Sequence, residues 1–316
     1  MKSASKKTHK IIESLPNGEQ ISFPLAVVRG NRDGPTLGII AGIHGGEFCG
    51  VEAALQIYSA LDPKELQGEI RIVPVANLSG FMSCTMFCVP QDGKKLSTAF
   101  PGASTGSYTE KLASILHREL ISKSDYVVEF RGGELVETMA TYVSTQRIGD
   151  KAHDVKAEQF AKAFGARNLI LLRERRETTA SESANTSATY SGKLGLLAEA
   201  GGQGLREKID VDFLKDGIFN VLAHLGMLKG RSLPADIEYR YLDSFVDVVS
   251  PVEGIFDWKV DVDEVVERGD VVGLVRDFSG ATLAEITAPE RGVILGIVTA
   301  PGVREGTTVI GIGRFM

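Results

Sequence analysis

The feature that most constrains the fold is an alternation of two patterns between residues 37 and 225. Short runs of β-branched and aliphatic residues are followed by amphipathic stretches with helical spacing. Strands that alternate with helices are typical of a mainly parallel sheet flanked by helices. The sequence therefore predicts an α/β domain, with strands at 37–41, 69–75, 126–130, 168–172 and 194–198 and helices at 50–61, 108–122, 154–164 and 210–225.

The pattern changes after Gly230. Residues 231–234 are typical of a linker, and the rest of the chain consists of short apolar runs separated by glycines, such as 254–256, 269–273 and 292–296. Such runs favour a compact all-β barrel or sandwich. Because 316 residues exceed what one average domain needs, we expect two domains, an α/β domain at 1–235 and a small C-terminal β domain at 236–316.

A polar segment interrupts the α/β pattern at residues 174–193. It is rich in Ser, Thr and Glu, and an apolar strand follows it immediately. Clusters of this composition between periodic segments are usually loops. We expect the segment to be too hydrophilic for the core and to form a lid over a ligand site.

Charge and composition exclude several classes of partner. With 35 basic and 41 acidic residues the net charge is -6, so the chain lacks the basic surface that nucleic acid or an anionic membrane requires. The basic N-terminus runs on without the apolar core of a signal peptide, and no apolar stretch reaches spanning length. Three cysteines without metal-type spacing fit a reducing compartment. We expect a cytoplasmic protein whose partner is a small molecule.

The run His44-Gly45-Gly46-Glu47 follows the first expected strand and precedes the first expected helix. At this position both polar side chains can turn toward one point beyond the carboxyl end of the sheet, where open α/β sheets place ligands. Imidazole nitrogen and carboxylate oxygen are both common zinc ligands. Taken alone the motif is weak, because a histidine beside glycines is more often a packed or capping residue.

Further motifs agree with this one, and together they resemble a known family. The chain is similar to the succinylglutamate desuccinylase/aspartoacylase family of zinc hydrolases, which share the carboxypeptidase fold. The resemblance covers nearly the whole chain, including the C-terminal β region. Besides residues 42–47 it is carried by 74–77 with 80–81, by 90–94 with 100–102, by 125–133 and by 198–202.

The resemblance implies a mechanism and a set of site residues. In the family a metal held by His, Glu and a second His activates water, and a glutamate before Gly-Gly acts as general base toward an amide carbonyl. On this chain His44 and Glu47 match the first two zinc ligands, and Glu199 matches the base. Glu199 also follows an expected strand, so it would project into the same crevice. A solvated or helix-capping carboxylate is the alternative.

The chain departs from the family where the third zinc ligand is expected. The family has an Asp-Leu-His run, whereas this chain has Glu129-Phe130-Arg131. Arginine is never deprotonated in proteins and offers no lone pair to a cation. Unless water, Glu129 or a distant candidate such as His153 completes the site, we expect zinc to bind weakly or not at all. In the alternative, Arg131 pairs with Glu47 or Glu199 and occupies the place of the metal as a structural cation.

A second departure lies in the expected substrate pocket. The family carries Asn-Leu-Asn-Arg before Phe-Pro-Gly and binds a substrate carboxylate with the arginine. This chain has Thr98 at that position, which cannot make a bidentate carboxylate contact. An N-acyl amino acid is therefore not assumed as substrate. The substrate-binding residues that we expect are Asn77, Lys94, Lys95, Thr98 and Arg131.

Two functions from different classes remain open. In the first, the chain is a zinc-dependent hydrolase of carbon–nitrogen bonds other than peptide bonds, which cleaves an amide or ester of a small acylated metabolite with metal-activated water and Glu199. In the second, it is a metal-free, catalytically impaired relative that binds a small anionic ligand through Arg131. Hydrogen bonds from Arg131 to both His44 and Glu47 would favour the second. The β domain is expected to wall the pocket or to mediate homo-oligomerisation.

Overall fold

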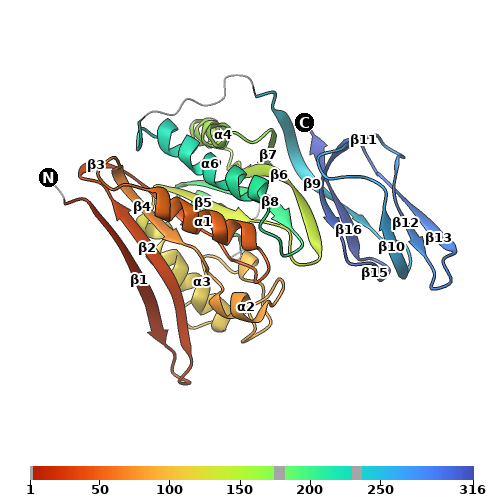
Figure 1. Cartoon of the computed structure of the whole chain (residues 1–316), viewed down its shortest axis with the longest axis horizontal. Helices are drawn as coiled ribbons and strands as arrows, with labels where there is room; N and C mark the ends of the chain where they lie inside the picture. Colours follow the sequence, from red (N-terminus) through yellow and green to blue (C-terminus); the bar gives the residue numbers. More distant parts are fainter. Residues whose placement is uncertain (1–2, 174–181, 230–236) are drawn as a thin grey trace.

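The centre of the molecule is a parallel sheet, as the sequence predicts. The computed structural model describes residues 3–173, 182–229 and 237–316 (Figure 1). The central strands pair in parallel, in the order β4, β3, β5 and β8. Most of their residues are buried, because helices cover both faces. The bounds are β3 (Arg32–Ile40), β4 (Gln67–Val73), β5 (Tyr126–Arg131) and β8 (Leu194–Gly202).

The flanks of the sheet are mixed rather than parallel, so the expectation of a mainly parallel sheet holds only for the centre. On one side β1 (Ser5–Ser14) and β2 (Gln20–Arg29) form a hairpin that joins β4 antiparallel. On the other side β6 (Glu137–Gln146) is antiparallel to β8, and β7 (Asn168–Leu172) is parallel to β6. The β1–β2 connection is a short turn, and such a turn forces adjacent strands to be antiparallel.

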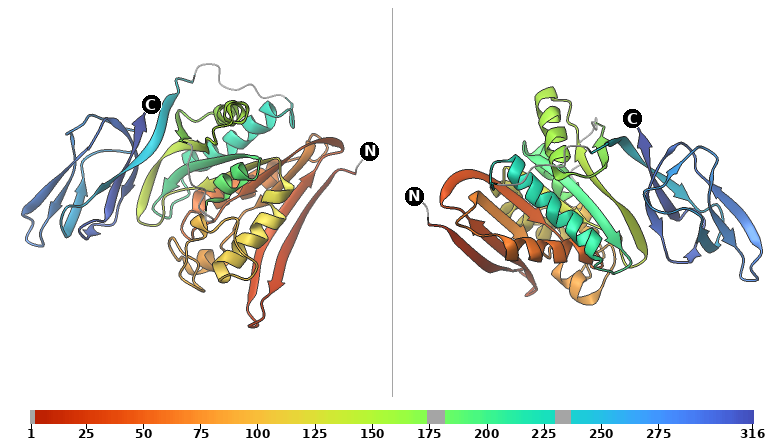
Figure 2. Two further views of the ribbon diagram at one scale, coloured as in Figure 1. Left: turned by 180° about the vertical axis from the view of Figure 1, so that it is seen from behind. Right: turned by 45° about the horizontal axis from the view of Figure 1, so that its top comes forward.

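Helices pack on both faces of this sheet (Figures 1 and 2). One face is covered by α1 (Phe48–Ala60), α4 (Lys151–Phe164) and α6 (Lys208–His224), whose apolar residues share one core with the central strands. The other face is covered by α3 (Tyr108–Glu119) and α5 (Ala184–Tyr190) over a second core. Shorter turns are α2 (Leu78–Ser83), η1 (Leu96–Thr98) and η2 (Ile121–Lys123). No described helix is long and apolar enough to cross a membrane.

The polar segment 174–193 is more buried than expected. Its residues 174–181 lie outside the described part of the chain, and the remainder contains α5, in which six consecutive residues are buried. The expectation that this segment is too hydrophilic for the core is therefore wrong for α5. Buried polar groups of this helix have partners; for example, Thr189 Oγ1 donates to the carbonyl of Asn185 at 3.1 Å, and the backbone N–H of Asn185 donates to Glu129 Oε2 at 3.0 Å. A lid function stays a prediction.

The C-terminal region is all-β, as predicted. Four of its strands extend the large sheet beyond β7: β9 (Arg240–Val249), β16 (Thr308–Phe315), β14 (Gly292–Val298) and β11 (Val265–Val266). The other four form a second sheet: β10 (Gly254–Trp258), β12 (Val271–Arg276), β13 (Thr282–Thr287) and β15 (Gly302–Val303). Side chains from both sets of four strands pack in one apolar core. The expected linker and the boundary at 235/236 lie outside the described residues.

The two regions are joined by hydrogen-bonded strands. β9 pairs with β7, and β14 also pairs with β6, so β6, β7, β9, β16 and β14 form a closed ring of strands. Buried side chains from both regions pack together at this junction, among them Tyr142, Leu242 and Leu295. Figure 1 shows the β region beside β6 and β7. The junction thus fixes the position of β6, which borders the candidate site.

Candidate functional site

The His44-Gly45-Gly46-Glu47 run forms the loop between β3 and α1. Both polar residues are buried, and the backbone N–H of His44 donates to Glu47 Oε2 at 3.3 Å. The loop needs its glycines, because a Cβ on Gly45 would lie 2.4 Å from the carbonyl oxygen of Gly80. The close packing holds both side chains at the carboxyl end of the sheet, as the sequence predicts.

Arg131 lies at the carboxyl end of β5 and contacts three polar side chains. Its Nε donates to Glu47 Oε1 at 2.8 Å, its Nη1 donates to Glu129 Oε1 at 3.3 Å, and its Nη2 lies 3.2 Å from His44 Nδ1. His44 Nδ1 also lies 2.9 Å from Glu47 Oε1, so it accepts from the guanidinium in one tautomer and donates to the carboxylate in the other. Of the two partners expected for Arg131, Glu47 or Glu199, the structure confirms Glu47, and the guanidinium also lies within hydrogen-bonding distance of His44.

Burial and the charges in this cluster set the protonation states. Burial would lower the pKa of Arg131, but Glu47, Glu129 and Glu199 raise it instead. Burial would raise the pKa of Glu47, but the positive charge of Arg131 lowers it to about 2. Burial raises the pKa of Glu129. Arg131 and Glu47 therefore form a permanent buried ion pair.

Glu199 lies on the strand beside Arg131. It pairs in register with Arg131 on β5 and with Tyr142 on β6. It lies within β8 rather than beyond its end, as β8 extends to residue 202. The Tyr142 hydroxyl donates to Glu199 Oε2. Burial raises the pKa of Glu199 to about 7, against the charge of Arg131 and the Tyr142 hydrogen bond.

The arrangement of donors does not fit a zinc ion. Arg131 bonds to His44 Nδ1 and Glu47 Oε1, and a permanent cation there repels a metal ion. Glu129 is already used by Arg131. In the described ranges no group of three or more His, Cys, Asp or Glu side chains is arranged to hold a metal. The expected zinc stays a prediction, and no chemical step below passes through it.

His153 is not placed to complete a metal site. Its Nε2 lies 3.0 Å from the carbonyl oxygen of Lys193, and Lys193 immediately precedes β8. His153 therefore lies at the amino end of β8, whereas Arg131 and Glu199 lie toward the carboxyl ends of β5 and β8. The distant candidate is thus at the wrong end of the sheet.

Two residues near the site were not predicted from the sequence. Glu134 is fully buried, accepts from the backbone N–H of Phe87 at 3.0 Å, and lies 3.9 Å from His44 Nδ1. Its position just after Gly132-Gly133 was a signal in the sequence. Tyr142 lies on β6, and the β-branched residues of 137–146 were the signal for that strand. The Tyr142 ring packs against Phe245 of β9 at 5.6 Å, so the C-terminal region supports it.

The other expected substrate-binding residues lie apart from this cluster. Asn77 is buried and caps α2, accepting from the backbone of Gly80 at 3.0 Å and donating to the carbonyl of Cys88 at 3.1 Å. Lys94 is exposed and lies 3.2 Å from Glu110 Oε2. Lys95 and Thr98 are also exposed. Within the described residues, no hydrogen bond or ion pair joins any of these four expected residues to Arg131 or Glu199.

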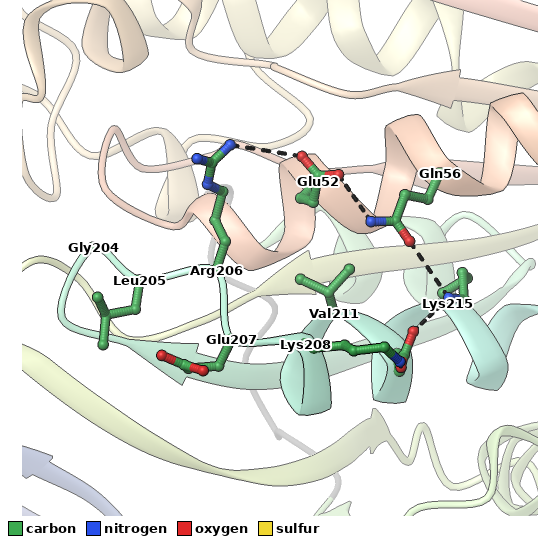
Figure 3. Close-up of a pocket in the computed structure, with 10 residues that line it drawn as sticks. Glu52, Gln56, Gly204, Leu205, Arg206, Glu207, Lys208, Val211 and Lys215 are labelled. Carbon is green, nitrogen blue, oxygen red and sulfur yellow. Dashed lines mark hydrogen bonds and ion pairs between the residues drawn. The ribbon is translucent and has the colours of Figure 1, made fainter.

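A separate cleft of about 670 Å³ lies between α1 and the segment that leads into α6 (Figure 3). Most of its charged side chains are paired with one another. Arg206 lies 3.8 Å from Glu52, and Gln56 donates to Glu52 at 2.9 Å. These groups are solvated and mutually neutralised, so we place no candidate site there.

Comparison with known proteins finds a matching family and a similar deacetylase. The family described as Succinylglutamate desuccinylase/Aspartoacylase catalytic domain matches residues 33–225. The N-alpha-acetyl-L-2,4-diaminobutyric acid deacetylase of Halomonas elongata is 30% identical over 296 residues, which are 92% of this chain and 84% of the relative.

Solved structures share the fold over almost the whole chain. An aspartoacylase family protein of Mesorhizobium loti is 27% identical with a TM-score of 0.83, over 99% of this chain and 96% of that one. The product-bound ectoine utilization protein EutE of Ruegeria pomeroyi is 24% identical with a TM-score of 0.86, over 98% and 95% of the two chains. At that identity the second comparison shows the fold alone.

Proposed function

We propose that this chain, which belongs to the succinylglutamate desuccinylase/aspartoacylase family, is a hydrolase that removes an acyl group from a small metabolite. The family match and the diaminobutyrate deacetylase relative support cleavage of an amide, that is, of a carbon–nitrogen bond outside a peptide. An ester is the alternative bond. Neither the acyl group nor its acceptor follows from the site.

The observation that carries this proposal is the environment of Glu199. It is a buried carboxylate beside a permanently charged arginine, and burial raises its pKa to about 7. A carboxylate with a pKa near the working pH is ionised in a large fraction of molecules and still holds a proton firmly once it takes one. These are the properties of a general base.

The reaction balances with water as the only co-reactant. Glu199 takes a proton from water while the water oxygen bonds to the carbonyl carbon, and the positive charge of Arg131 stabilises the negative charge that develops on the carbonyl oxygen. The carbon–nitrogen bond then breaks, and the proton on Glu199 passes to the nitrogen of the leaving amine. The products are a carboxylic acid and an amine.

The test is a deacylation assay with Glu199→Gln. Amine release is measured on a panel of N-acetyl and N-succinyl amino acids and N-acetyl diamines. We expect the wild type to turn over at least one of them, and the variant to lose about 10²–10⁴-fold in rate with an unchanged circular dichroism spectrum. Glu52→Gln on α1, outside the site, is the matched control and should retain the rate. Equal rates for wild type and Glu199→Gln would exclude Glu199 as the base.

The second candidate is a binding protein that has lost hydrolysis. The contacts of Arg131 with both His44 and Glu47 favour it, since they occupy the groups that would hold the metal. Glu47 and Glu129 already balance the charge of Arg131, so an anion would gain little from charge alone. Calorimetric binding of a panel compound without any amine release, with the same affinity in Glu199→Gln, would select this candidate.

A further inference from the structure

The hydrogen-bonding capacity of Arg131 is only partly used. A guanidinium has five N–H groups in a planar fork. The contacts with Glu47 and Glu129 use two of them, and the contact with His44 Nδ1 uses at most a third, on the other terminal nitrogen. One N–H on each terminal nitrogen is left after these contacts. The two can point to a common acceptor, because the fork suits oxygen atoms.

The three contacts also hold the guanidinium in one place. They come from two elements, the loop between β3 and α1, which carries His44 and Glu47, and β5 itself, which carries Glu129. The Arg131 side chain is only 15% exposed, so water cannot readily replace these partners. A cation held in this way differs from a bound metal ion in that it cannot dissociate.

We propose that the Arg131 guanidinium permanently takes the place of the zinc ion and presents its two remaining N–H groups to the carbonyl oxygen of the acyl group. This inference rests on the proposed function for the identity of the ligand oxygen, but its statement about zinc does not. Glu199 pairs in register with Arg131, so the base and the carbonyl-binding group stand on adjacent strands. Fixed donors aimed at a developing oxyanion act without reorganisation, and the hydrolysis needs no metal.

The first arm of the test is zinc binding, which does not require any activity. Zinc sulfate is titrated calorimetrically into the chelator-treated wild type and into Arg131→His, with metal content measured after dialysis. The new imidazole would join His44 and Glu47 in a set of three zinc ligands. We expect substoichiometric zinc in the wild type and about one equivalent in the variant, with affinity at least about 100-fold higher. Stoichiometric, equally tight zinc in the wild type would overturn the proposal.

Arg131→Gln is the matched control for this arm. It removes the charge and opens space without supplying the imidazole, so it should bind zinc clearly more weakly than Arg131→His. If Arg131→Gln binds zinc as tightly as Arg131→His does, the imidazole introduced at position 131 does not act as a third zinc ligand. If Arg131→His fails to fold by circular dichroism, the wild-type titration alone still decides whether a guanidinium stands in for the metal.

The second arm uses the panel compound that the wild type hydrolyses. We expect 1,10-phenanthroline and EDTA to leave the rate unchanged, and Arg131→Lys, which keeps the charge but loses the fork, to lower kcat by about 100-fold. A rate abolished by chelator and restored by zinc would overturn the proposal. If no compound is hydrolysed, the proposed function fails, while the zinc titration still tests the replacement of the metal.

Discussion

Two arginine–carboxylate clusters in this protein have the same chemistry but opposite surroundings. In the first, Arg131 is held by Glu47 and Glu129, and its side chain is 15% exposed. In the second, Asp243 on β9 accepts from Arg173 Nε at 3.0 Å and from Arg314 Nε at 2.9 Å. The side chains of these two arginines are 70% and 35% exposed. The Asp243 side chain is itself only 7% exposed, so water reaches the second cluster through its arginines.

The difference shows that burial, rather than pairing, makes charges interdependent. In the Asp243 cluster, burial opposes the hydrogen bonds from Arg314 and Arg173, which still lower the pKa of Asp243, and water can replace either arginine. In the Arg131 cluster, each charge is held by its neighbours, and removing one leaves another without solvent or partner. The Arg131 cluster should therefore respond to substitution and to pH as a unit.

The largest expected effect follows from removing the central cation. Arg131→Met leaves Glu47 and Glu129 buried without their shared partner, and we expect the free energy of unfolding to fall by about 3–5 kcal/mol. Urea denaturation at pH 7 measures this. A loss no greater than that of Arg314→Met would show that the two clusters do not differ.

The next effect is a dependence of stability on pH that comes from Glu199. The folded protein keeps this carboxyl protonated up to about pH 7, whereas the unfolded chain releases the proton near 4.5. The folded state thus binds more protons in this interval, and stability falls by about 3 kcal/mol as pH rises from 4.5 through 7. Urea denaturation at pH 5 and pH 8 should show the fall in the wild type, and Glu199→Gln should remove this part of it. An equal fall in both proteins would contradict the raised pKa.

A smaller effect is expected for Tyr142→Phe. The hydroxyl favours the ionised form of Glu199, so its loss should raise the pKa of Glu199 further, by about one pH unit. Carbon-13 NMR of the glutamate carboxyl groups measures this pKa, with Glu199→Gln to assign the signal. Tyr108→Phe is the control, because its hydroxyl donates to the backbone carbonyl of Gln20 on β2. An unchanged pKa in Tyr142→Phe would mean that the hydroxyl does not act on the base.

The smallest effect is expected in the exposed cluster. Arg314→Met leaves Asp243 paired with Arg173, whose side chain is 70% exposed. We expect the free energy of unfolding to change less than in any variant above, and the difference from wild type to shrink further in 1 M NaCl, since salt screens exposed charges. Urea denaturation at low and high salt measures both. A loss close to that of Arg131→Met would remove the distinction between the clusters.

Much of the site was predictable because it depends on local order along the chain. Residues 37–40, 126–130 and 194–198 all lie in central strands. Since parallel strands end at one edge of the sheet, His44, Glu47 and Arg131 had to come close together. The pairing of Arg131 with Glu47 followed from their opposite charges at that edge. The expected roles of Asn77, Lys94, Lys95 and Thr98 stay predictions, and in the described part of the chain no hydrogen bond or ion pair joins them to Arg131 or Glu199.

The amino-acid sequence by itself determined which strands carry the polar residues, and that a cation stands where the family has a metal ligand. Only the tertiary structure decided that Tyr142 meets Glu199, that Glu134 lies near His44, and that the polar helix α5 is buried. Strand and loop signals lie in the periodicity of neighbouring residues, which the sequence displays directly. Cross-strand register and burial depend on residues that are far apart in the chain. Tyr142 and Glu199, for example, are 57 positions apart, and local patterns carry no information about such pairs.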